Sequence, residues 1–425
     1  MTVKEIKPAG RFRARVVVPG SKSMTNRALI CAALARGESI IRSASDSDDT
    51  ALMANGLNQL GVLARKSEDR LHVQGTGGKL YAPKFPIPVG NAGTTFRFLL
   101  SLAALAEGKT VFEGAERMGE RPLDDLLAAL RQAGVAVEKD PVLPRWKVEG
   151  GTMNTSMISV RSDKSSQFLS SVLLIAPALK HDLLVATEGP VSSTSYVAMT
   201  LDVMKQFGVR DVESRADGFS VRAGSGYTPT DFLVEADASS ASYPLAAAAI
   251  TGGEVHVEGV RLNSTQGDAG FAGILEAMGC RVHWSEHGVS IQGTGNLTGV
   301  DVDMNTMPDV VPTLTAVALF AQGPTRIRNV AHLRYKESDR LQALATELAR
   351  LGAAITLFPD GLEIVPCSLH GGQLDTYGDH RLVMSFALVG LRVAGVRVED
   401  AEAVKKSYPT FWAEFEKFYH SISTI

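Results

Sequence analysis

The sequence has little of several features that define whole classes of protein. Its 425 residues include only three cysteines, Cys31, Cys280 and Cys367, which are far apart and odd in number. Neither a disulfide framework nor a zinc site is therefore suggested. Neither sign of charge is in large excess, because 43 Lys and Arg stand against 46 Asp and Glu, a net charge of −3. That balance predicts no nucleic-acid or membrane partner, so any anion site has to be local.

Long hydrophobic runs are also missing. Apolar stretches such as FLLSLAALA and SSVLLIAPAL are too short to span a bilayer. The N-terminal MTVKEIKPAG lacks the apolar core of a signal peptide. The nine histidines include no metal-ligand spacing such as HExxH, so we expect no metal site. We expect a cytoplasmic protein that works as a monomer.

What the sequence does contain is a repeat. The phrases LNQLGVLA, LRQAGVAV, MKQFGVRD, LEAMGCRV and LARLGAAI place a glycine at intervals of 73, 74, 71 and 73 residues. These glycines are Gly61, Gly134, Gly208, Gly279 and Gly352. Each lies where the C-terminus of a helix favours a left-handed residue. A hairpin-like segment such as RLHVQGTGG follows most of them, and its recurring Gly-rich tail indicates a turn rather than a nucleotide loop.

A second, almost wholly apolar helix recurs once per repeat. Its copies begin near residues 22, 91, 165, 239, 308 and 378. Helices that are apolar on every side are buried, whereas amphipathic helices such as RPLDDLLAALRQAG flank sheets. Six units of roughly 71 residues account for the chain. The sixth is incomplete, because the last expected helix, FWAEFEKFYH, has no hairpin after it, and the N-terminal RFRARVVV could supply the missing strands.

The repeats predict two similar α/β domains of three units each, with the apolar helices inside the sheets. One domain is expected to comprise residues 1–20 plus 237–425, and the other residues 21–236. With the helices buried inside the sheets, the active-site cleft is expected between the two domains.

Cations gather at the expected helix starts. Capping explains Ser, Thr, Asn and Asp there, but Lys and Arg in a first turn oppose the helix dipole by roughly 0.3–1 kcal/mol each. Arg and Lys bind carboxylate and phosphate, so the set indicates a site for small ligands with several anionic groups. For any single cation, a solvated surface charge remains the alternative. The seven cations are Lys22, Arg27, Arg121, Lys336, Arg340, Arg381 and Lys406.

Two carboxylates stand among these cations, Asp309 in MPDVV and Glu337 in YKESDR. Asp309 could merely start a helix, and Glu337 could merely complement a helix dipole. As functional groups, both could transfer protons between substrates whose charges the cations neutralise. His380 in GDHR is expected to be a hydrogen-bond donor rather than a metal ligand.

Seven motifs together carry a resemblance to a known family. PGSKSMTNRAL, GNAGTTFRFL, ERPLDDL, SSQFLS, MPDVVPT, RYKESDRL and DHRLVMSFAL closely resemble the 3-phosphoshikimate 1-carboxyvinyltransferase (EPSP synthase) family, over essentially the whole chain and in the right order. The resemblance implies two domains, each of three βαβαββ units in an inside-out α/β barrel. It implies transfer of the enolpyruvyl group of phosphoenolpyruvate to the 5-hydroxyl of shikimate 3-phosphate through a tetrahedral ketal, with no metal or organic cofactor. The pathway implied is aromatic amino acid biosynthesis.

The resemblance also implies roles for individual residues. Asp309 would be the base for the 5-hydroxyl, and Glu337 or Lys22 the proton donor to the methylene carbon. Where many relatives carry asparagine this chain has His332, which can also donate to phosphate. The residues implied around shikimate 3-phosphate are Lys22, Ser23, Arg27, Ser165, Ser166, Gln167, Ser193, Tyr196, Asp309, His332 and Lys336. Those implied around phosphoenolpyruvate are Lys22, Asn91, Gly93, Arg121, Gln167, Arg340, His380, Arg381 and Lys406.

Two alternatives stay open at this point. The UDP-N-acetylglucosamine enolpyruvyltransferases share fold and donor, but typically carry GKN where this chain has SKS, and a cysteine in the loop that here reads GAERMGERPL. A non-catalytic protein that binds anionic metabolites on the same fold is the second alternative. The presence of both Asp309 and Glu337 disfavours it. For an enzyme, we expect the domains to close on the substrates and exclude water.

Overall fold

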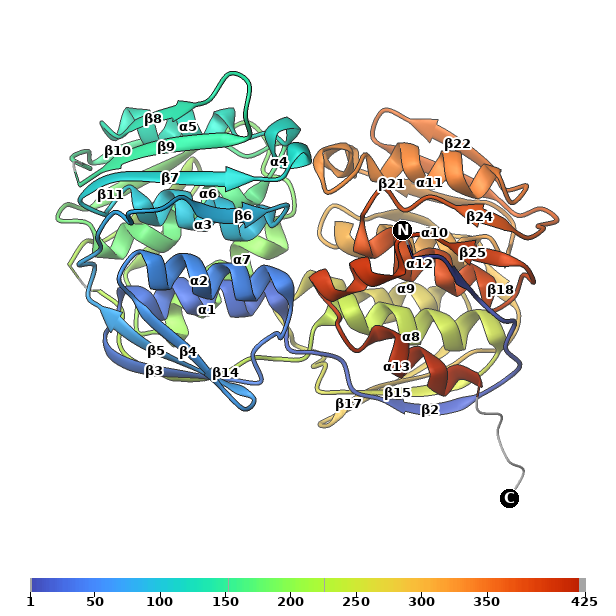
Figure 1. The fold of residues 1–425 in the computed structure, drawn as a ribbon. Coiled ribbons are helices and arrows are strands. Elements are labelled where there is room, and N and C mark those ends of the chain that lie inside the picture. The colour runs from blue at the N-terminus through green and yellow to red at the C-terminus, as the bar shows by residue number, and fades with distance from the viewer. Residues whose placement is uncertain (1, 152, 225, 420–425) are drawn as a thin grey trace. The chain divides into compact units, whose positions relative to one another are not determined.

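The computed structural model describes residues 2–151, 153–224 and 226–419. The chain divides into two compact units: unit 1 is Met1–Pro19 with Glu235–Ile425, and unit 2 is Gly20–Val234. In each unit taken by itself, sheets enclose a set of helices (Figure 1).

Among its described residues, unit 2 holds three four-stranded sheets with the same internal order. Each begins with a parallel pair and continues into an antiparallel hairpin, as in β14-β3-β5-β4. The other two sheets have the orders β6-β7-β9-β8 and β10-β11-β13-β12. The strands are β3 (Arg36–Arg42), β4 (Leu63–Ser67), β5 (Arg70–Thr76), β6 (Ile87–Gly90), β7 (Gly108–Gly114), β8 (Ala136–Lys139), β9 (Arg145–Gly150), β10 (Met157–Arg161), β11 (Leu183–Glu188), β12 (Val212–Arg215), β13 (Gly218–Val221) and β14 (Asp231–Leu233).

The helices of unit 2 fall into the two expected groups. Every residue of the inner helix α1 from Met24 to Leu34 is buried, as the prediction of an apolar interior helix requires. The inner helices are α1 (Lys22–Leu34), α3 (Gly93–Ala103) and α6 (Ser166–Ile175), which η1 (Ala176–Ala178) extends. The others are α2 (Asp48–Gln59), α4 (Glu116–Glu120), α5 (Asp124–Gln132) and α7 (Thr194–Gln206).

In the part of unit 1 that the structure describes, this plan recurs with two four-stranded sheets and one three-stranded sheet. Their orders are β16-β17-β15-β2, β19-β21-β23-β22 and β1-β25-β24, and β18 pairs with β20 separately. The strands are β1 (Lys4–Glu5), β2 (Arg13–Val16), β15 (Glu254–Glu258), β16 (Arg281–Ser285), β17 (Gly288–Gln292), β18 (Leu297–Thr298), β19 (Asp301–Asp303), β20 (Ala321–Gln322), β21 (Thr325–Arg328), β22 (Ala354–Phe358), β23 (Gly361–Val365), β24 (Gly372–Leu374) and β25 (Val396–Val398).

The inner helices of unit 1 are also buried, which completes the predicted fold of two similar α/β halves. They are α8 (Ala238–Thr251), α10 (Val311–Ala318) and α12 (His380–Gly390). The outer helices are α9 (Phe271–Ala277), α11 (Arg340–Ala349) and α13 (Phe411–Glu416). Short 3-10 helices are η2 (Gly267–Gly270), η3 (Pro308–Val310), η4 (Ala331–Tyr335), η5 (Ala401–Lys406) and η6 (Lys417–Tyr419). The last helix expected from FWAEFEKFYH thus divides into α13 and η6, and its final residue, His420, lies outside the described residues.

Each unit completes one sheet with a strand from the segment that leads into the other unit. β2 directly precedes α1 of unit 2 in sequence but pairs in parallel with β15 of unit 1, with Arg13 opposite Glu254. β14 directly precedes α8 of unit 1 but pairs in parallel with β3 of unit 2. We call this arrangement the strand exchange.

One detail of the sequence prediction is wrong. RFRARVVV does not complete the sixth unit, because its strand β2 belongs to the sheet β16-β17-β15-β2, whose other strands come from the fourth unit. The sheet of the sixth unit, β1-β25-β24, is completed by β1, whose Lys4 lies opposite Val398 in an antiparallel pair with β25. Two residues are too short a stretch to reveal a strand by alternation of polar and apolar side chains.

The repeated glycines serve two purposes. The five at the helix ends have φ between +81° and +104°, which confirms the predicted left-handed positions. The first glycine of a hairpin tail has a different role. A Cβ on Gly150 would lie 2.2 Å from the carbonyl oxygen of Ala103, at the end of α3, and Gly75 and Gly293 are in the same situation. These glycines let a strand pack directly on the last turn of an inner helix.

Candidate active site

Arg340 joins three carboxylates of unit 1. It is the first residue of α11 and is 1% exposed. Its Nε donates to Asp379 Oδ2 at 2.8 Å, Nη1 to Asp309 Oδ1 at 3.0 Å and Nη2 to Glu337 Oε2 at 2.9 Å. Burial works against the charge on Arg340, but the three carboxylates outweigh it and raise the pKa of the guanidinium. The two predicted catalytic carboxylates thus share one buried cation.

Asp309 lies in η3 between two guanidinium groups. Its Oδ2 accepts from Arg381 Nη2 at 2.7 Å, and its Oδ1 accepts from Arg340. Burial alone would raise the pKa of Asp309, but Arg381, Arg340 and then Lys336 hold it well below its usual range. Asp309 is therefore an ionised carboxylate near neutral pH.

The start of α12 supplies the next two residues. Asp379 caps the helix, accepting from the backbone N–H of Arg381 at 3.0 Å and from Ser338 Oγ at 3.1 Å. His380 and Arg381 are the first two helical residues, and His380 Nδ1 lies 3.5 Å from Asp379 Oδ1. The predicted helix start at GDHR is confirmed.

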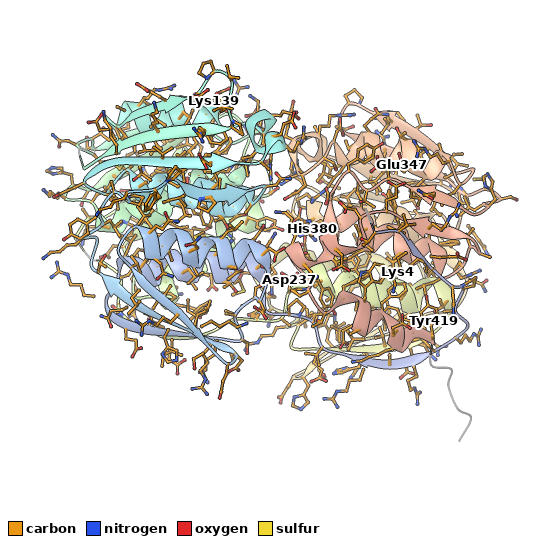
Figure 2. All side chains as sticks on the ribbon, in the orientation of Figure 1. Lys4, Lys139, Asp237, Glu347, His380 and Tyr419 are labelled. Carbon is orange, nitrogen blue, oxygen red and sulfur yellow. The ribbon has the colours of Figure 1, made fainter. Side chains whose placement is uncertain are left out.

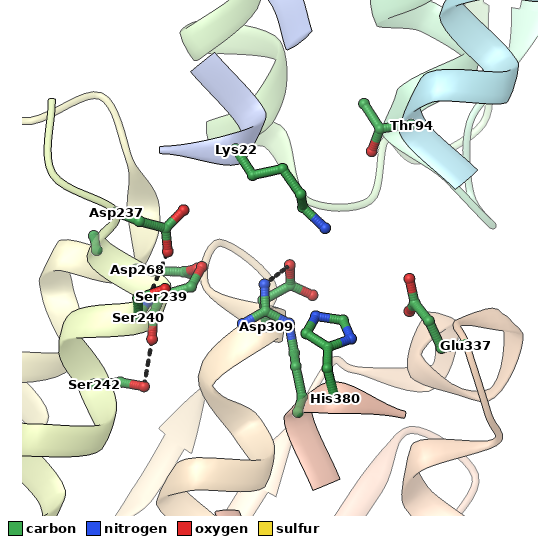
Figure 3. Close-up of polar contacts among 12 residues, drawn as sticks. Lys22, Thr94, Asp237, Ser239, Ser240, Ser242, Asp268, Asp309, Glu337 and His380 are labelled. Carbon is green, nitrogen blue, oxygen red and sulfur yellow. Dashed lines mark hydrogen bonds and ion pairs between the residues drawn. The ribbon is translucent and has the colours of Figure 1, made fainter. Parts of the chain in front are cut away.

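A further acidic residue near Asp309 is Asp268, which contacts the start of α8 (Figure 3). Asp237 caps α8 by accepting from Ser240 N at 2.7 Å, and Ser239 donates its hydroxyl to Asp268 of η2. Burial first, and then the charge of Asp309, raise the pKa of Asp268 to about 7. Sequence reasoning missed Asp268, because nothing in its local sequence distinguishes it from a polar turn residue.

His332 and Lys336 lie on the η4 side of this site. His332 is 4% exposed, and burial followed by the charges of Lys336 and Arg340 lowers its pKa to about 3. Near neutral pH His332 is consequently a neutral imidazole, which can still donate one hydrogen bond to a phosphate.

In unit 2, Lys22 opens α1 and pairs with an acid that sequence reasoning missed. Its Nζ lies 2.8 Å from Oδ2 of Asp49, which is 2% exposed in the first turn of α2. Ser21 caps α1 by accepting from Met24 N at 3.4 Å. Asp49 looked like an ordinary first-turn acid, and only the packing of α1 on α2 brings it to Lys22.

Arg27 is buried against neutral oxygens. Its Nε donates to Thr200 Oγ1 at 2.7 Å, and its other nitrogens donate to the carbonyls of Ser23 at 2.9 Å and Tyr196 at 3.1 Å. Burial lowers the pKa of Arg27 to about 10, so it stays charged near neutral pH. A buried cation bound to neutral acceptors suits an incoming anion.

Arg121 and Gly93 fit each other closely. Arg121 Nη1 donates to the carbonyl of Asn91 at 2.9 Å and to Asn91 Oδ1 at 3.1 Å. A Cβ on Gly93 would lie 2.5 Å from Arg121 Nη2. The absence of a side chain at Gly93 thus makes room for the guanidinium, a reason that the sequence did not reveal.

Gln167 is oriented by a second arginine that the sequence did not single out. Arg97, which is 3% exposed, donates to Gln167 Oε1 at 2.6 Å and to the carbonyl of Pro122 at 2.9 Å. Gln167 Nε2 donates to Thr94 Oγ1 at 3.0 Å. An arginine inside the apolar run GTTFRFL was the available signal.

Three serines implied by the resemblance, Ser165, Ser166 and Ser193, lie at two helix starts of unit 2. Ser165 caps α6, accepting from Gln167 N at 3.3 Å, and Ser166 is the first residue of that helix. Ser193 precedes α7 with φ of 53°, and Tyr196 follows in the first turn.

The assignment of all seven cations to first turns is only partly right. Lys22, Arg340 and Arg381 do lie in the first turns of α1, α11 and α12. The other four do not, so the dipole argument does not apply to them. Arg27 lies in the second turn of α1, Arg121 follows α4, Lys336 follows η4, and Lys406 ends η5. Glu337 likewise precedes α11 instead of opening it.

Within the described ranges, no three His, Cys, Asp or Glu side chains are grouped so that they could hold a metal ion. No helix among the described residues is long and apolar enough to cross a membrane.

Comparison with solved structures shows that this fold is that of the EPSP synthases. The fold is shared with a solved EPSP synthase from Acinetobacter baumannii, with a TM-score of 0.80 and 26% identity, covering 98% of this chain and 97% of that one. An enolpyruvyl transferase from Streptomyces tendae shares the fold at 17% identity with a TM-score of 0.78.

Sequence comparison then defines the family. Residues 6–415 match the family EPSP synthase (3-phosphoshikimate 1-carboxyvinyltransferase). A 3-phosphoshikimate 1-carboxyvinyltransferase from Syntrophobacter fumaroxidans is 46% identical, covering 97% of this chain and 99% of the relative. One from Nostoc punctiforme is 40% identical over 95% of each chain. The chain belongs to the EPSP synthase family.

Proposed function

We propose that this chain transfers the enolpyruvyl group of phosphoenolpyruvate to the 5-hydroxyl of shikimate 3-phosphate and releases phosphate. The observation that carries the proposal is the ionised Asp309 held between Arg340 and Arg381, with Glu337 on the same Arg340. The relatives named 3-phosphoshikimate 1-carboxyvinyltransferase support the choice of substrates. The reaction belongs to the shikimate pathway of aromatic amino acid biosynthesis.

The charges of the substrates match the cations of the two units. Each substrate carries a carboxylate and a phosphate, and arginine and lysine are the residues that bind such groups. For shikimate 3-phosphate we propose Lys22, Ser23, Arg27, Ser165, Ser166, Gln167, Ser193, Tyr196, Asp309, His332 and Lys336. For phosphoenolpyruvate we propose Lys22, Asn91, Gly93, Arg121, Gln167, Arg340, His380, Arg381 and Lys406.

Asp309 takes the proton of the 5-hydroxyl as that oxygen attacks the enol carbon of phosphoenolpyruvate. Glu337 or Lys22 gives a proton to the methylene carbon, which forms the tetrahedral ketal. The same group then takes a proton back from the methyl carbon as the bond from the ketal carbon to the phosphate oxygen breaks, which restores the double bond and releases phosphate.

The low pKa of Asp309 means that substrate has to bind before this carboxylate can act as a base. A carboxylate this acidic is a weak base, since a catalytic base works best with a pKa near the working pH. Anionic substrate groups bound to Arg340 and Arg381 offset the positive charge beside Asp309 and so raise its pKa. Asp309 thereby becomes basic once substrate is present.

Asp309→Ala tests this mechanism. We expect phosphate release from the two substrates to fall by roughly 10²–10⁴-fold, the usual size of a general-base effect, while binding of shikimate 3-phosphate is largely retained. The matched control is Asp301→Ala, which removes an exposed carboxylate paired with Arg328 and leaves turnover unchanged. A fully active Asp309→Ala would remove Asp309 as the base.

The acceptor distinguishes this proposal from its two alternatives. Faster phosphate release with UDP-N-acetylglucosamine than with shikimate 3-phosphate would reassign the acceptor. Binding of both substrates without any turnover would indicate the non-catalytic metabolite-binding protein.

We further propose that both units, as separate domains, contribute to substrate binding and close on the substrates. Small-angle scattering is expected to show a smaller radius of gyration with both substrates than with neither. The proposed site of action is the cytoplasm and the proposed active form a monomer, which cell fractionation and sedimentation test.

A further inference from the structure

Glu347, a buried acid on α11 (Figure 2), has no part in the chemistry proposed above. It is 0% exposed. Its Oε1 accepts from the Tyr377 hydroxyl at 2.8 Å and its Oε2 from the Asp375 backbone N–H at 3.0 Å. Arg350, which is mostly exposed, lies 3.1 Å from the same Oε2. A carboxylate is costly to bury, so its filled hydrogen bonds are what make this position tolerable.

The segment that Glu347 holds leads directly into the proposed site. Tyr377 and Gly378 have φ of 52° and 64°, two successive left-handed residues just before the cap of α12. For Tyr377 this conformation costs on the order of 1–2 kcal/mol. Asp375 Oδ1 accepts from Tyr377 N at 2.7 Å, which supports the turn locally. Strained backbone persists where the surroundings over-determine it, and it is concentrated at functional sites.

Helix α11 holds this segment at two points. Arg340 and Glu347 are seven residues apart, which places them on one face of the helix, two turns from each other. Arg340 binds Asp379 at 2.8 Å, while Glu347 binds Tyr377 and Asp375. Residues 375–379 are therefore fixed at both ends by one rigid element.

We propose that Glu347 is a positioning residue of the active site. Through Tyr377 and Asp375 it sets the direction in which the first turn of α12 presents His380 and Arg381. The inference rests on the proposed function, in which those two residues bind phosphoenolpyruvate. Because most residues proposed for shikimate 3-phosphate lie in unit 2, displacement of α12 affects the two substrates unequally.

Two variants test the role of Glu347. Glu347→Gln keeps the side-chain volume but loses the charge and one of the two acceptor oxygens. The expected rise in KM for phosphoenolpyruvate is roughly 5–30-fold, the effect of one lost buried hydrogen bond to a charged group, with KM for shikimate 3-phosphate within about twofold. Tyr377→Phe removes only the hydroxyl and is expected to shift the same KM by roughly 3–10-fold. Arg350→Gln is the matched control, because it removes the exposed partner of Glu347 and leaves both KM values unchanged.

Hydrogen exchange gives a reading that does not depend on turnover. In Tyr377→Phe, amides of residues 375–383 are expected to exchange faster while the rest of unit 1 keeps its protection. Unchanged exchange there, or an equal rise of both KM values, would overturn the positioning role. A wild-type protein without turnover on these substrates would overturn the proposed function instead, and the exchange measurement would still decide the role of Glu347. If Glu347→Gln does not fold, Tyr377→Phe decides it alone.

Discussion

At the residue scale, Gly93 and Arg121 show how little space the site leaves. A methyl group on Gly93 would meet the Arg121 guanidinium at 2.5 Å, so Gly93→Ala is expected to displace that cation. We expect KM for phosphoenolpyruvate to rise roughly tenfold, the effect of one weakened charged contact, and KM for shikimate 3-phosphate to stay unchanged. Gly119→Ala is the control, because its new Cβ has only an ordinary 3.4 Å contact with Pro144. Steady-state kinetics with each substrate varied in turn measures both constants, and equal changes in the two would contradict the assignment.

His332 predicts a specific dependence of stability on pH. Its folded pKa, about 3, lies below the unfolded value of about 6.5, so the unfolded chain takes up a proton first as the pH falls. The stability that neutral His332 contributes is therefore complete above about pH 6.5 and is lost as the pH falls towards 3, by about 1.4 kcal/mol per pH unit. Between pH 7.5 and 5 the wild type should lose about 2 kcal/mol more than His332→Asn. Urea unfolding of both proteins at several pH values measures this, and parallel curves would refute it.

At the element scale, the hairpin glycines decide how sheet and inner helix pack. A Cβ on Gly150 would lie 2.2 Å from the carbonyl oxygen of Ala103 and 2.3 Å from that of Ala106. Gly150→Ala is expected to lower the free energy of unfolding by about 1–3 kcal/mol, because β9 has to move away from α3. Denaturant unfolding provides the measurement.

The control for Gly150 is another glycine without such contacts. Gly273 lies inside α9, and a Cβ there would meet no heavy atom within 4 Å. Gly273→Ala is expected to raise stability by about 0.5–1 kcal/mol, since alanine favours a helix. Equal effects of the two substitutions would mean that packing against the helix end is not what Gly150 provides.

At the scale of the whole molecule, the strand exchange predicts which unit loses hydrogen-exchange protection when β2 or β14 is disrupted. Val16 is fully buried on β2 in the core of unit 1, and Phe232 is buried on β14 in the core of unit 2. Val16→Asp should therefore remove hydrogen-exchange protection from β15 and spare β3, whereas Phe232→Asp should do the reverse. Loss of protection in both sheets from either variant would contradict the assignment of these strands.

Much of the fold could be predicted from the sequence, because its signals are local. A left-handed glycine, a capping serine and an apolar face depend on neighbours a few residues away, so Gly61, Ser165 and the helix α1 were all predicted correctly. The site residues proved harder. Arg27 and Lys336 were chosen for a first-turn position that neither occupies.

The sequence by itself determined the six repeats, the inner and outer helices and the set of charged motifs, since each is a pattern within one stretch of chain. Only the tertiary structure decided which polar side chains contact each other. Lys22 pairs with Asp49, and Arg340 pairs with Asp379. Glu347 accepts a hydrogen bond from Tyr377, and each of these pairs joins different elements of the fold. The strand exchange is of the same kind, because a strand's partner follows from the sheet that forms around it. Contacts between distant segments arise from packing, and no spacing along the chain encodes them.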